Sequence, residues 1–456
     1  MVLCALAVVS ALDAGCSRRS EDGAAADRDP GGARGSSAGS SPAAAQDSAL
    51  SDFDLRNQQI ALYQKRLLAD PENGIDLAQL AGLYMQRARE TGDKSDYARA
   101  EEMARRSLAV QKWHNGKSSM TLASSLVAQH RFAEARDVAR QLDADYPGVV
   151  PYEALLAELE MEMGDYDAAR ALFDSLAADR AELSVAPRLA RWLEISGEPD
   201  SALAILSAAR DEAARRSDVP REQVAWFHLR VGDLLARCGR LDEADAVYRA
   251  GLEVREDDSR LLAAMARAAA LRNDWRAAIY FGQRAAAKLA DPPTLVLLGD
   301  AYDALGDSAQ AAAYYAPIEA AALGGPEPFN RVGLAHLLDH DRRVSDALEQ
   351  LRKEIAIRKD IQGYDLLAWA LHKSGDDRAA REAMTAARRL GTRDPLVLFH
   401  AAMIERALGD RAAARRALTE ALAINPRFHA RYAAVARAAL DSLGALGAPE
   451  RSAPAN

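Results

Sequence analysis

The sequence predicts an all-α chain that repeats one helical unit. One hundred of the 456 residues are Ala, the strongest helix former, whereas aromatic residues, which favour strands, make up only 6%. A charged fraction of 27% excludes a polytopic membrane protein and a wholly disordered chain. The net charge of −9 argues against a nucleic-acid partner, because such a partner requires a basic surface.

The first 16 residues have the pattern of a signal peptide. The largely apolar run 2–12 is too short to span a bilayer as a helix but suits a signal-peptide core. The pair Ala14-Gly15 before Cys16 resembles a bacterial lipobox, although Asp13 and the absence of a preceding basic residue depart from that pattern. The resemblance implies lipidation of Cys16 and an outer-membrane lipoprotein facing the periplasm. A plain secretory signal and a chance apolar start are the alternatives.

Residues 17–50 are expected to form a disordered tether. The stretch 20–48 consists mainly of Gly, Ala, Ser, Asp and Pro and holds no large apolar residue. Such a segment cannot bury enough apolar surface to offset the chain entropy lost on folding. We therefore expect the folded body to begin near residue 51.

The rest of the chain is built from a repeated motif. Gly-Asp-x-x-x-Ala occurs at 164–169, 306–311, 375–380 and 409–414. Extending this frame gives ten alanines spaced by 33 to 36 residues, apart from one interval of 42: Ala100, Ala135, Ala169, Ala202, Ala244, Ala278, Ala311, Ala347, Ala380 and Ala414. Twelve residues upstream, nine positions hold only Ala or Gly: Ala123, Ala157, Ala190, Gly232, Ala266, Gly299, Ala335, Ala368 and Ala402. Two columns of small residues predict closely packed helix pairs.

This period and these columns resemble the tetratricopeptide repeat, a 34-residue helix–turn–helix unit. The match covers about residues 75 to 426 in ten repeats. It implies a right-handed α-α superhelical solenoid over residues 51–443, in which a single helix near 55–68 precedes the repeats and a capping helix near 428–443 follows them. Residues 444–456 are expected to be a disordered tail.

An insertion and a long interval interrupt the regular spacing of the repeats. An insertion at 87–94 is expected to lengthen the turn of the first repeat, and an extended charged stretch at 210–221 to fill the 42-residue interval. A hinge is expected near 210–223, between repeats one to four and repeats five to ten. Trp113, Trp192 and Trp226 lie at inter-repeat packing positions and are expected in the core, as is Trp275.

The sequence contains no recognisable catalytic motif. It holds no GxxxxGK[ST] loop, no HExxH, no CxxC pair and no GxSxG elbow. We therefore expect a non-enzymatic chain without a cofactor.

The resemblance implies that function lies in the concave groove lined by the first helix of each repeat. The groove positions of the later repeats would bind a protein or peptide partner: Asp300, Asp303, His336, Asp339, His340, Asp365, Trp369, His372, Lys373, Phe399 and Arg406. Among these, Trp369 and Phe399 would be apolar anchors. Asp300, Asp303, Asp339 and Asp365 would orient a basic partner.

The histidines in this set allow two further interpretations. His336 and His340 are four residues apart and share a helical face, and His372 comes from the next repeat, so the three could bind zinc. Alternatively, the cluster is an ordinary solvated polar face. His400 is expected to be a buried core histidine.

The resulting prediction is a protein-binding scaffold at the bacterial cell envelope, attached to the membrane only through its N-terminal lipid. An assembly or secretion accessory factor for envelope polymers or outer-membrane complexes is the first alternative. A metal-binding protein centred on the His/Asp cluster is the second.

Overall fold

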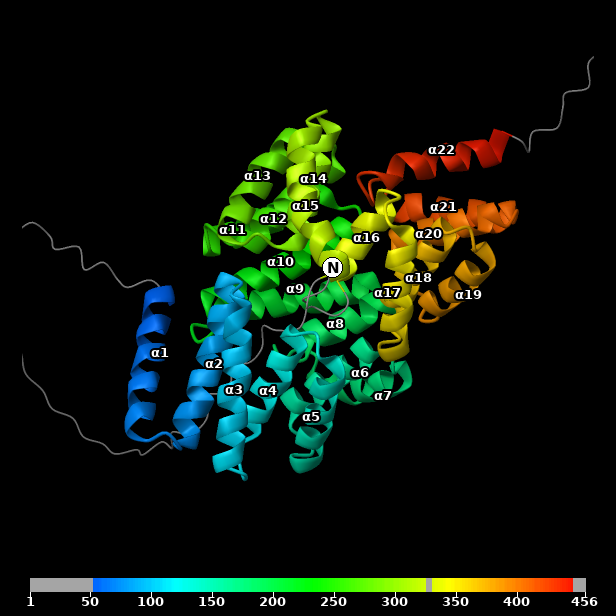
Figure 1. The fold of residues 1–456 in the computed structure, drawn as a ribbon. Helices are drawn as coiled ribbons and strands as arrows, with labels where there is room; N and C mark the ends of the chain where they lie inside the picture. Colours follow the sequence, from blue (N-terminus) through cyan, green and yellow to red (C-terminus); the bar gives the residue numbers. More distant parts are fainter. Residues whose placement is uncertain (1–51, 325–329, 446–456) are drawn as a thin grey trace, which may run out of the picture.

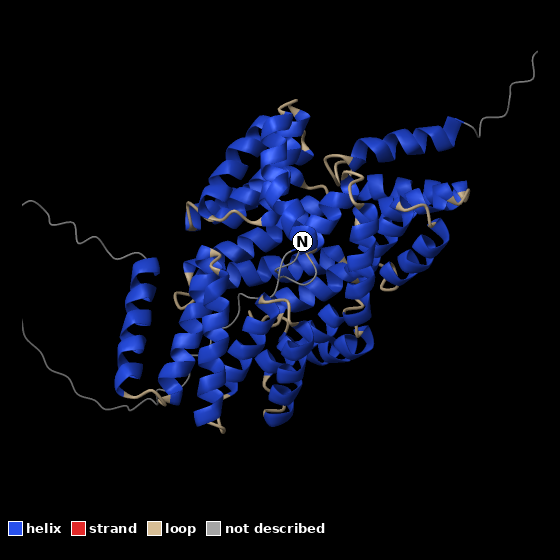
Figure 2. Cartoon of the chain, viewed as in Figure 1, coloured by secondary structure: helices blue, strands red, loops and turns tan. Residues whose placement is uncertain are grey.

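The computed structural model describes residues 52–324 and 330–445. Within these ranges every regular element is a helix, 22 of them α-helices, and no strand occurs (Figure 2). The all-α prediction is therefore confirmed for the described residues. The predicted signal peptide with Cys16, the tether, and the tail beyond residue 445 lie outside them.

Ten consecutive helix pairs form a solenoid between one N-terminal and one C-terminal helix (Figure 1). The end helices are α1 (Asp52–Ala69) and α22 (Tyr432–Ala445). The first five pairs comprise α2 (Gly74–Thr91), α3 (Lys94–Val110), α4 (Gly116–Ala128), α5 (Phe132–Asp145), α6 (Val150–Met163), α7 (Tyr166–Ser175), α8 (Ala186–Ile195), α9 (Pro199–Arg215), α10 (Arg221–Arg237) and α11 (Leu241–Val254). The last five comprise α12 (Ser259–Leu271), α13 (Trp275–Lys288), α14 (Pro292–Ala304), α15 (Ser308–Gly324), α16 (Arg331–Asp339), α17 (Val344–Ile357), α18 (Ile361–Lys373), α19 (Asp377–Ala387), α20 (Pro395–Ala407) and α21 (Arg411–Ile424). Each pair is one repeat, numbered one to ten below, and the predicted α-α solenoid is confirmed.

The Gly-Asp-x-x-x-Ala motif marks the turn inside a repeat. Gly164 ends α6 in the left-handed conformation, with φ of 82°, and Asp165 then caps α7 by accepting a hydrogen bond from the backbone N–H of Ala168. Asp376 and Asp410 cap α19 and α21 in the same way. The motif alanine follows on the buried face of the second helix, and nine of the ten column alanines are completely inaccessible to solvent.

The choice between Ala and Gly in the second column depends on the facing residue. A Cβ atom at Gly232 would overlap the ring of Tyr248, and one at Gly299 would overlap the ring of Tyr315. Each tyrosine lies 16 residues after its glycine, on the second helix of the same repeat. A large ring on one helix therefore requires glycine on the other.

Repeats three, four and five each contact the repeat that lies five units further along the chain, which is repeat eight, nine and ten respectively. The turn at Gly164 in repeat three meets the loop after repeat eight, where the N–H of Lys359 donates to the carbonyl of Met163 at 3.1 Å. Gly197 and Gly239, in repeats four and five, meet the loops after repeats nine and ten in the same manner. The solenoid thus makes two superhelical turns that are in direct contact.

Two expectations about the irregular segments are corrected. The insertion at 87–94 mainly prolongs helix α2 to Thr91 rather than lengthening a loop. The stretch expected to be extended is helical as far as Arg215, because Ala202, Leu206, Ala209 and Ala213 continue a buried stripe along α9. Only residues 216–220 form a loop, and the hinge stays a prediction.

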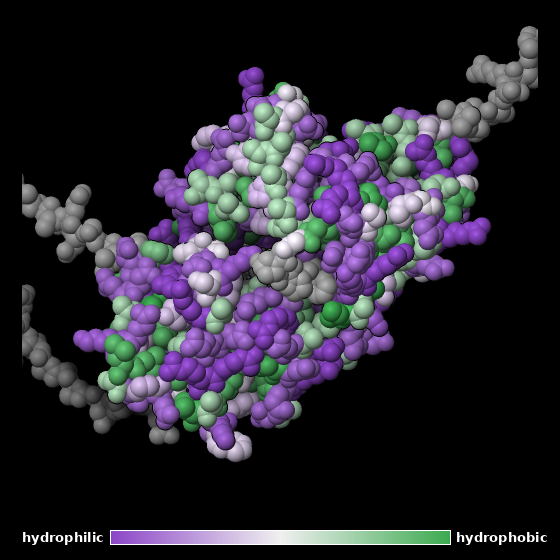
Figure 3. All heavy atoms as spheres, in the orientation of Figure 1, coloured by the Kyte–Doolittle hydropathy of each residue, from purple (hydrophilic) through white to green (hydrophobic). Residues whose placement is uncertain are grey.

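The predictions for the tryptophans are partly confirmed. Trp192 and Trp226 are buried, but Trp113 lies in the loop after α3 and is 81% exposed, so its predicted core position is wrong. The face shown in Figure 3 is largely hydrophilic, with scattered apolar residues. Among the described helices, none is both long and apolar enough to cross a bilayer.

Candidate functional site

The predicted binding residues lie on the first helices of repeats seven to ten, which are α14, α16, α18 and α20, or directly after α16 in the case of His340. Several of these residues contact one another, and the set is here called the C-terminal groove. The segment that precedes and begins α22, residues 428–432, enters this groove and contacts several of the predicted residues. The sequence alone did not predict this arrangement, although it did place a helix after the last repeat.

Tyr432 is the central residue of that segment. Its ring stacks on Phe399 with centroids 4.8 Å apart and meets the edge of Trp369 at 5.7 Å. Its hydroxyl donates to Asp339 Oδ1 at 2.7 Å. Burial, and then the adjacent Asp339 carboxylate, raise the pKa of Tyr432 well above its ordinary value, so the hydroxyl keeps its proton and donates. The pair predicted as apolar anchors and one predicted aspartate thus bind a tyrosine of the same chain.

Trp369 lies between several polar neighbours. The imidazole of His400 stacks on it with centroids 4.3 Å apart, and the Lys373 ammonium lies 4.9 Å from its ring centroid. His400 Nδ1 in turn lies 2.9 Å from Asp365 Oδ1. Trp369 and Phe399 are only 3% and 1% exposed beside Tyr432, and their role as anchors for a partner stays a prediction.

The other end of the C-terminal groove is polar. Asp300 accepts a hydrogen bond from the Tyr315 hydroxyl at 2.7 Å and lies 3.1 Å from His340 Nε2. Burial opposes ionisation of Asp300, but its hydrogen bonds to His340 and Tyr315 outweigh burial and lower the pKa. When His340 Nε2 donates to Asp300, Nδ1 can accept from the Arg431 guanidinium, 3.3 Å away. Asp300 is therefore partly structural, because it holds Tyr315 over Gly299.

The remaining predicted residues differ in exposure. Asp303 and Arg406 are exposed at the rim. His336 is 2% exposed, with Nε2 lying 3.2 Å from a Glu319 oxygen, and burial lowers its pKa. His372 faces Asp377, and Lys373 donates to Asp341. Partner binding by these residues stays a prediction.

The three histidines do not converge on one point. His336 and His340 pack against Tyr315, whereas His372 stacks on Trp369 and directs Nδ1 toward Asp377. Within the described part of the chain, no group of three or more His, Cys, Asp or Glu side chains is placed to hold a metal ion. The geometry therefore gives the metal alternative no support.

The middle of the solenoid interior is occupied by charged side chains. Glu194 on α8 contacts Arg191 at 3.1 Å and Arg237 on α10 at 2.5 Å. Burial opposes its ionisation, but Arg237, Arg191 and Arg230 outweigh burial and lower the pKa of Glu194 to about 2. This network joins repeats four and five.

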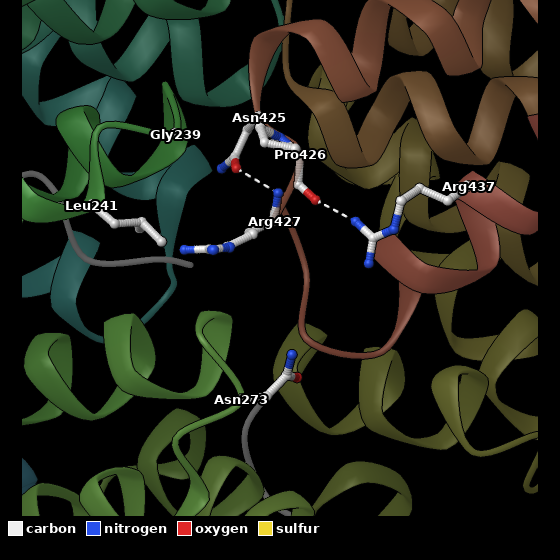
Figure 4. A pocket seen from close by; sticks show the side chains of 7 residues that line it. All are labelled: Gly239, Leu241, Asn273, Asn425, Pro426, Arg427 and Arg437. Carbon is white, nitrogen blue, oxygen red and sulfur yellow. Dashed lines mark hydrogen bonds between the residues drawn. The ribbon is translucent and has the colours of Figure 1, made fainter.

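A cavity of about 410 Å³ lies where the two superhelical turns meet (Figure 4). Asn425 is 1% exposed and bridges the turns, because its amide donates to the carbonyls of Ala236 and Arg237 while its oxygen accepts from the N–H of Arg427. The Arg437 guanidinium donates to the carbonyl of Pro426 at 2.7 Å. The hydrogen bonds at this wall hold the turns together, so we assign the cavity a structural role.

Comparisons with known proteins agree with the repeat architecture. The family model described as tetratricopeptide repeat matches residues 227–258 and 292–316, which cover most of α10–α11 and of α14–α15. No curated protein sequence is significantly similar to this chain.

Solved structures of helical-repeat proteins align over much of the chain. Yeast Tom70 is 12% identical over 87% of this chain and 95% of its own, with a TM-score of 0.34. The type IV pilus biogenesis factor PilW is 17% identical over 49% of this chain and 99% of its own, with a TM-score of 0.38. The human IFIT1 dimer with PPP-AAAA is 16% identical over 74% and 77%, with a TM-score of 0.47. These low identities and scores carry no argument about function.

The family-model match and the ten helix pairs point to the same unit. The two matched segments coincide with the two repeats in which a glycine faces a tyrosine, Gly232 with Tyr248 and Gly299 with Tyr315. Repeats of this family typically serve as non-catalytic interaction scaffolds. The chain is therefore a helical solenoid, two segments of which match the tetratricopeptide repeat.

Proposed function

We propose that this protein is a non-catalytic interaction scaffold that binds a basic, aromatic segment of a partner protein in the C-terminal groove. The observation that carries the proposal is the chain's own segment 428–432, which occupies that groove through Tyr432 and Arg431. These contacts support complementarity of the groove for a tyrosine next to an arginine. A partner segment with the same chemistry would replace it.

The charges in the groove favour such a segment. Asp300, Asp339 and Asp365 come from three successive repeats, and Asp303 adds an exposed carboxylate at the rim. An arginine brought beside these groups gains charge-assisted hydrogen bonds, and a tyrosine gains stacking on Phe399. Because the helices already hold the groove in shape, little ordering entropy is lost when the segment binds.

We further propose that the scaffold works at the bacterial cell envelope, attached through a lipid on Cys16. The support is the lipobox-like sequence around Cys16 and the low-complexity stretch 17–50 that follows it. An assembly or secretion accessory role is a second candidate on the same grounds. The absence of catalytic motifs in the sequence supports a binding role rather than an enzymatic one.

The direct test uses the chain's own segment as a probe. A labelled peptide with the sequence of residues 427–434 is added to the wild-type protein and to Tyr432→Ala, and binding is followed by fluorescence anisotropy. The tethered segment competes at an effective concentration on the order of millimolar, so we expect the peptide to bind Tyr432→Ala about tenfold or more tightly than the wild type.

Two variants make the outcome specific. Adding Asp339→Ala to Tyr432→Ala removes the acceptor for the tyrosine hydroxyl and should weaken the peptide, whereas adding Asp303→Ala, an exposed rim change of equal charge, should weaken it less. Equal binding of the peptide to Tyr432→Ala and to the two double variants would refute recognition in the groove. In-cell cross-linking of Tyr432→Ala with and without Asp339→Ala then identifies the partner, and a purely cytosolic set of partners would refute the envelope location.

A further inference from the structure

The two irregular segments of the repeat pattern meet at a second cavity, away from the C-terminal groove. Gln86 and Glu90 come from the end of α2, which the insertion at 87–94 prolongs, and Ser217 and Glu222 lie within the 42-residue interval, in the loop before α10 and at the start of that helix. Together with Arg56 and Gln59 on α1 these residues line a cavity of about 310 Å³. That volume is at the lower end of the range of small-ligand sites, on the order of 300–1,000 Å³.

Arg56 is the most buried cationic group at this cavity. Its side chain is 2% exposed, and its guanidinium lies over the ring of Phe53, 5.1 Å from the ring centroid. It contacts the Glu90 carboxylate, yet none of its three nitrogens has a hydrogen-bond partner of acceptable geometry among the described residues. Leaving buried donors without acceptors is costly, so this arrangement favours an acceptor from outside.

The neighbouring groups show the same excess of donors. Arg89 is 8% exposed, lies 3.9 Å from a Glu222 oxygen, and has no hydrogen-bond partner for Nε or Nη1 in the described chain. The amide nitrogen of Gln223 also lacks one. The buried side-chain atoms of Arg56, Arg89 and Gln223 that lack a hydrogen-bond partner are therefore all donors.

The carboxylates at this cavity are already engaged. Glu90 accepts from the Gln86 amide at 3.2 Å and contacts Arg56. Glu222 accepts from Arg260 Nη1 at 2.6 Å, and Arg260 also binds Asp258 at 2.7 Å. Among the residues that line the cavity, the cations Arg56 and Arg221 equal the anions Glu90 and Glu222 in number, while Arg89 and Arg260 contact Glu222 from outside the lining.

We propose that this cavity binds an oxyanion, the carboxylate or phosphate group of a small ligand or chain end, with Arg56 as the principal contact. The planar guanidinium offers donors in a fork that fits two oxygens of one anion. Gln59 and Ser217 supply further polar groups at the wall. The site depends on the two insertions that distinguish repeats one and four, and it is independent of the proposed groove function.

The test is binding of small oxyanions to the purified full-length chain. Thermal stabilisation and calorimetric titration are measured with inorganic phosphate, and separately with N-acetylglycine and its uncharged amide. We expect phosphate or N-acetylglycine to bind and the amide not to bind. The preference between the first two distinguishes a phosphate from a carboxylate ligand. If neither anion binds at millimolar concentration, the proposal is wrong.

Three variants assign the binding to this cavity. Arg56→Gln should weaken the anion about tenfold or more, because it removes a charge-assisted donor pair. Lys65→Gln makes the same charge change on an exposed part of α1 and should bind as the wild type does. Glu90→Gln removes the carboxylate that competes for Arg56 and should bind the anion more tightly.

The opposite signs expected at Arg56 and Glu90 keep the test valid if one variant folds poorly. Anion binding unchanged in Arg56→Gln, or weakened in Glu90→Gln, would overturn the proposal. Loss of binding in Lys65→Gln comparable to that in Arg56→Gln would instead show a diffuse charge effect and would overturn it equally.

Discussion

Replacing Gly164 by alanine should separate the two superhelical turns at one defined point. Gly164 has φ of 82°, and an added Cβ would overlap the carbonyl of Lys359 in repeat eight. Gly306 provides a matched control, because its φ is 81° and nothing lies within 4 Å of its added Cβ. Both variants place alanine in the left-handed region, but only Gly164→Ala also disturbs the contact between turns.

The magnitudes follow from these contacts. The left-handed conformation costs an alanine about 1–2 kcal/mol, and this cost should be the whole effect of Gly306→Ala. Gly164→Ala must also move the loop at Lys359, which weakens the 3.1 Å bond from Lys359 N–H to Met163 and the 2.7 Å bond from Ile361 N–H to the Tyr166 hydroxyl. At about 1 kcal/mol for each bond, the added cost is about 2 kcal/mol.

Amide hydrogen exchange is the appropriate assay, because a long repeat array need not unfold in one step. An added cost of about 2 kcal/mol corresponds to roughly 30-fold faster exchange at the Lys359 and Ile361 amides in Gly164→Ala. Gly306→Ala should leave these two amides unchanged. If both variants exchange alike there, the turns are not coupled at Gly164 and the stacked architecture is refuted.

Three further predictions concern other parts of the chain. Glu194 contributes stability that is present above pH 4.5 and is lost as the pH falls toward 2. At roughly 1.4 kcal/mol per pKa unit, this contribution amounts to about 3 kcal/mol. Glu194→Gln should therefore lower the free energy of unfolding at pH 7 and make that free energy depend less on pH in the acid range. Arg331→Met leaves Glu354 and Asp360 buried without their shared cation and should cost about 3–5 kcal/mol in urea unfolding; a cost below about 1 kcal/mol would contradict this. Trp113→Ala should change thermal stability by less than about 0.5 kcal/mol, because the ring is exposed.

The fold was predictable because its signals are local and repeated. Each Gly-Asp pair ends one helix and caps the next, so a short motif locates a turn wherever it occurs. Ten alanines at a spacing of 33 to 36 residues, apart from one interval of 42, then give the number of units. Trp113 escaped this reasoning because it lies in a loop between repeats, where helical spacing does not apply.

The candidate site was only partly predictable because its contacts join distant parts of the sequence. The groove positions of Trp369 and Phe399 follow from the repeat, but their occupant, Tyr432, lies beyond the last repeat unit. One missed signal was present in the sequence. Gly232 and Gly299 each precede a tyrosine by 16 residues and an aspartate by one, a pairing that indicates a structural tyrosine–aspartate bond.

The offset of five between stacked repeats also limits how this chain can change in evolution. Most solenoids gain or lose units readily, since each unit contacts only its immediate neighbours. Here the removal of one unit between repeats three and eight would bring the turn at Gly164 against the end of repeat nine instead of repeat eight. Loop lengths and side chains suited to one partner would then face another, so a change in the number of units would disrupt the contacts between the turns, and the chain is less modular than its sequence suggests.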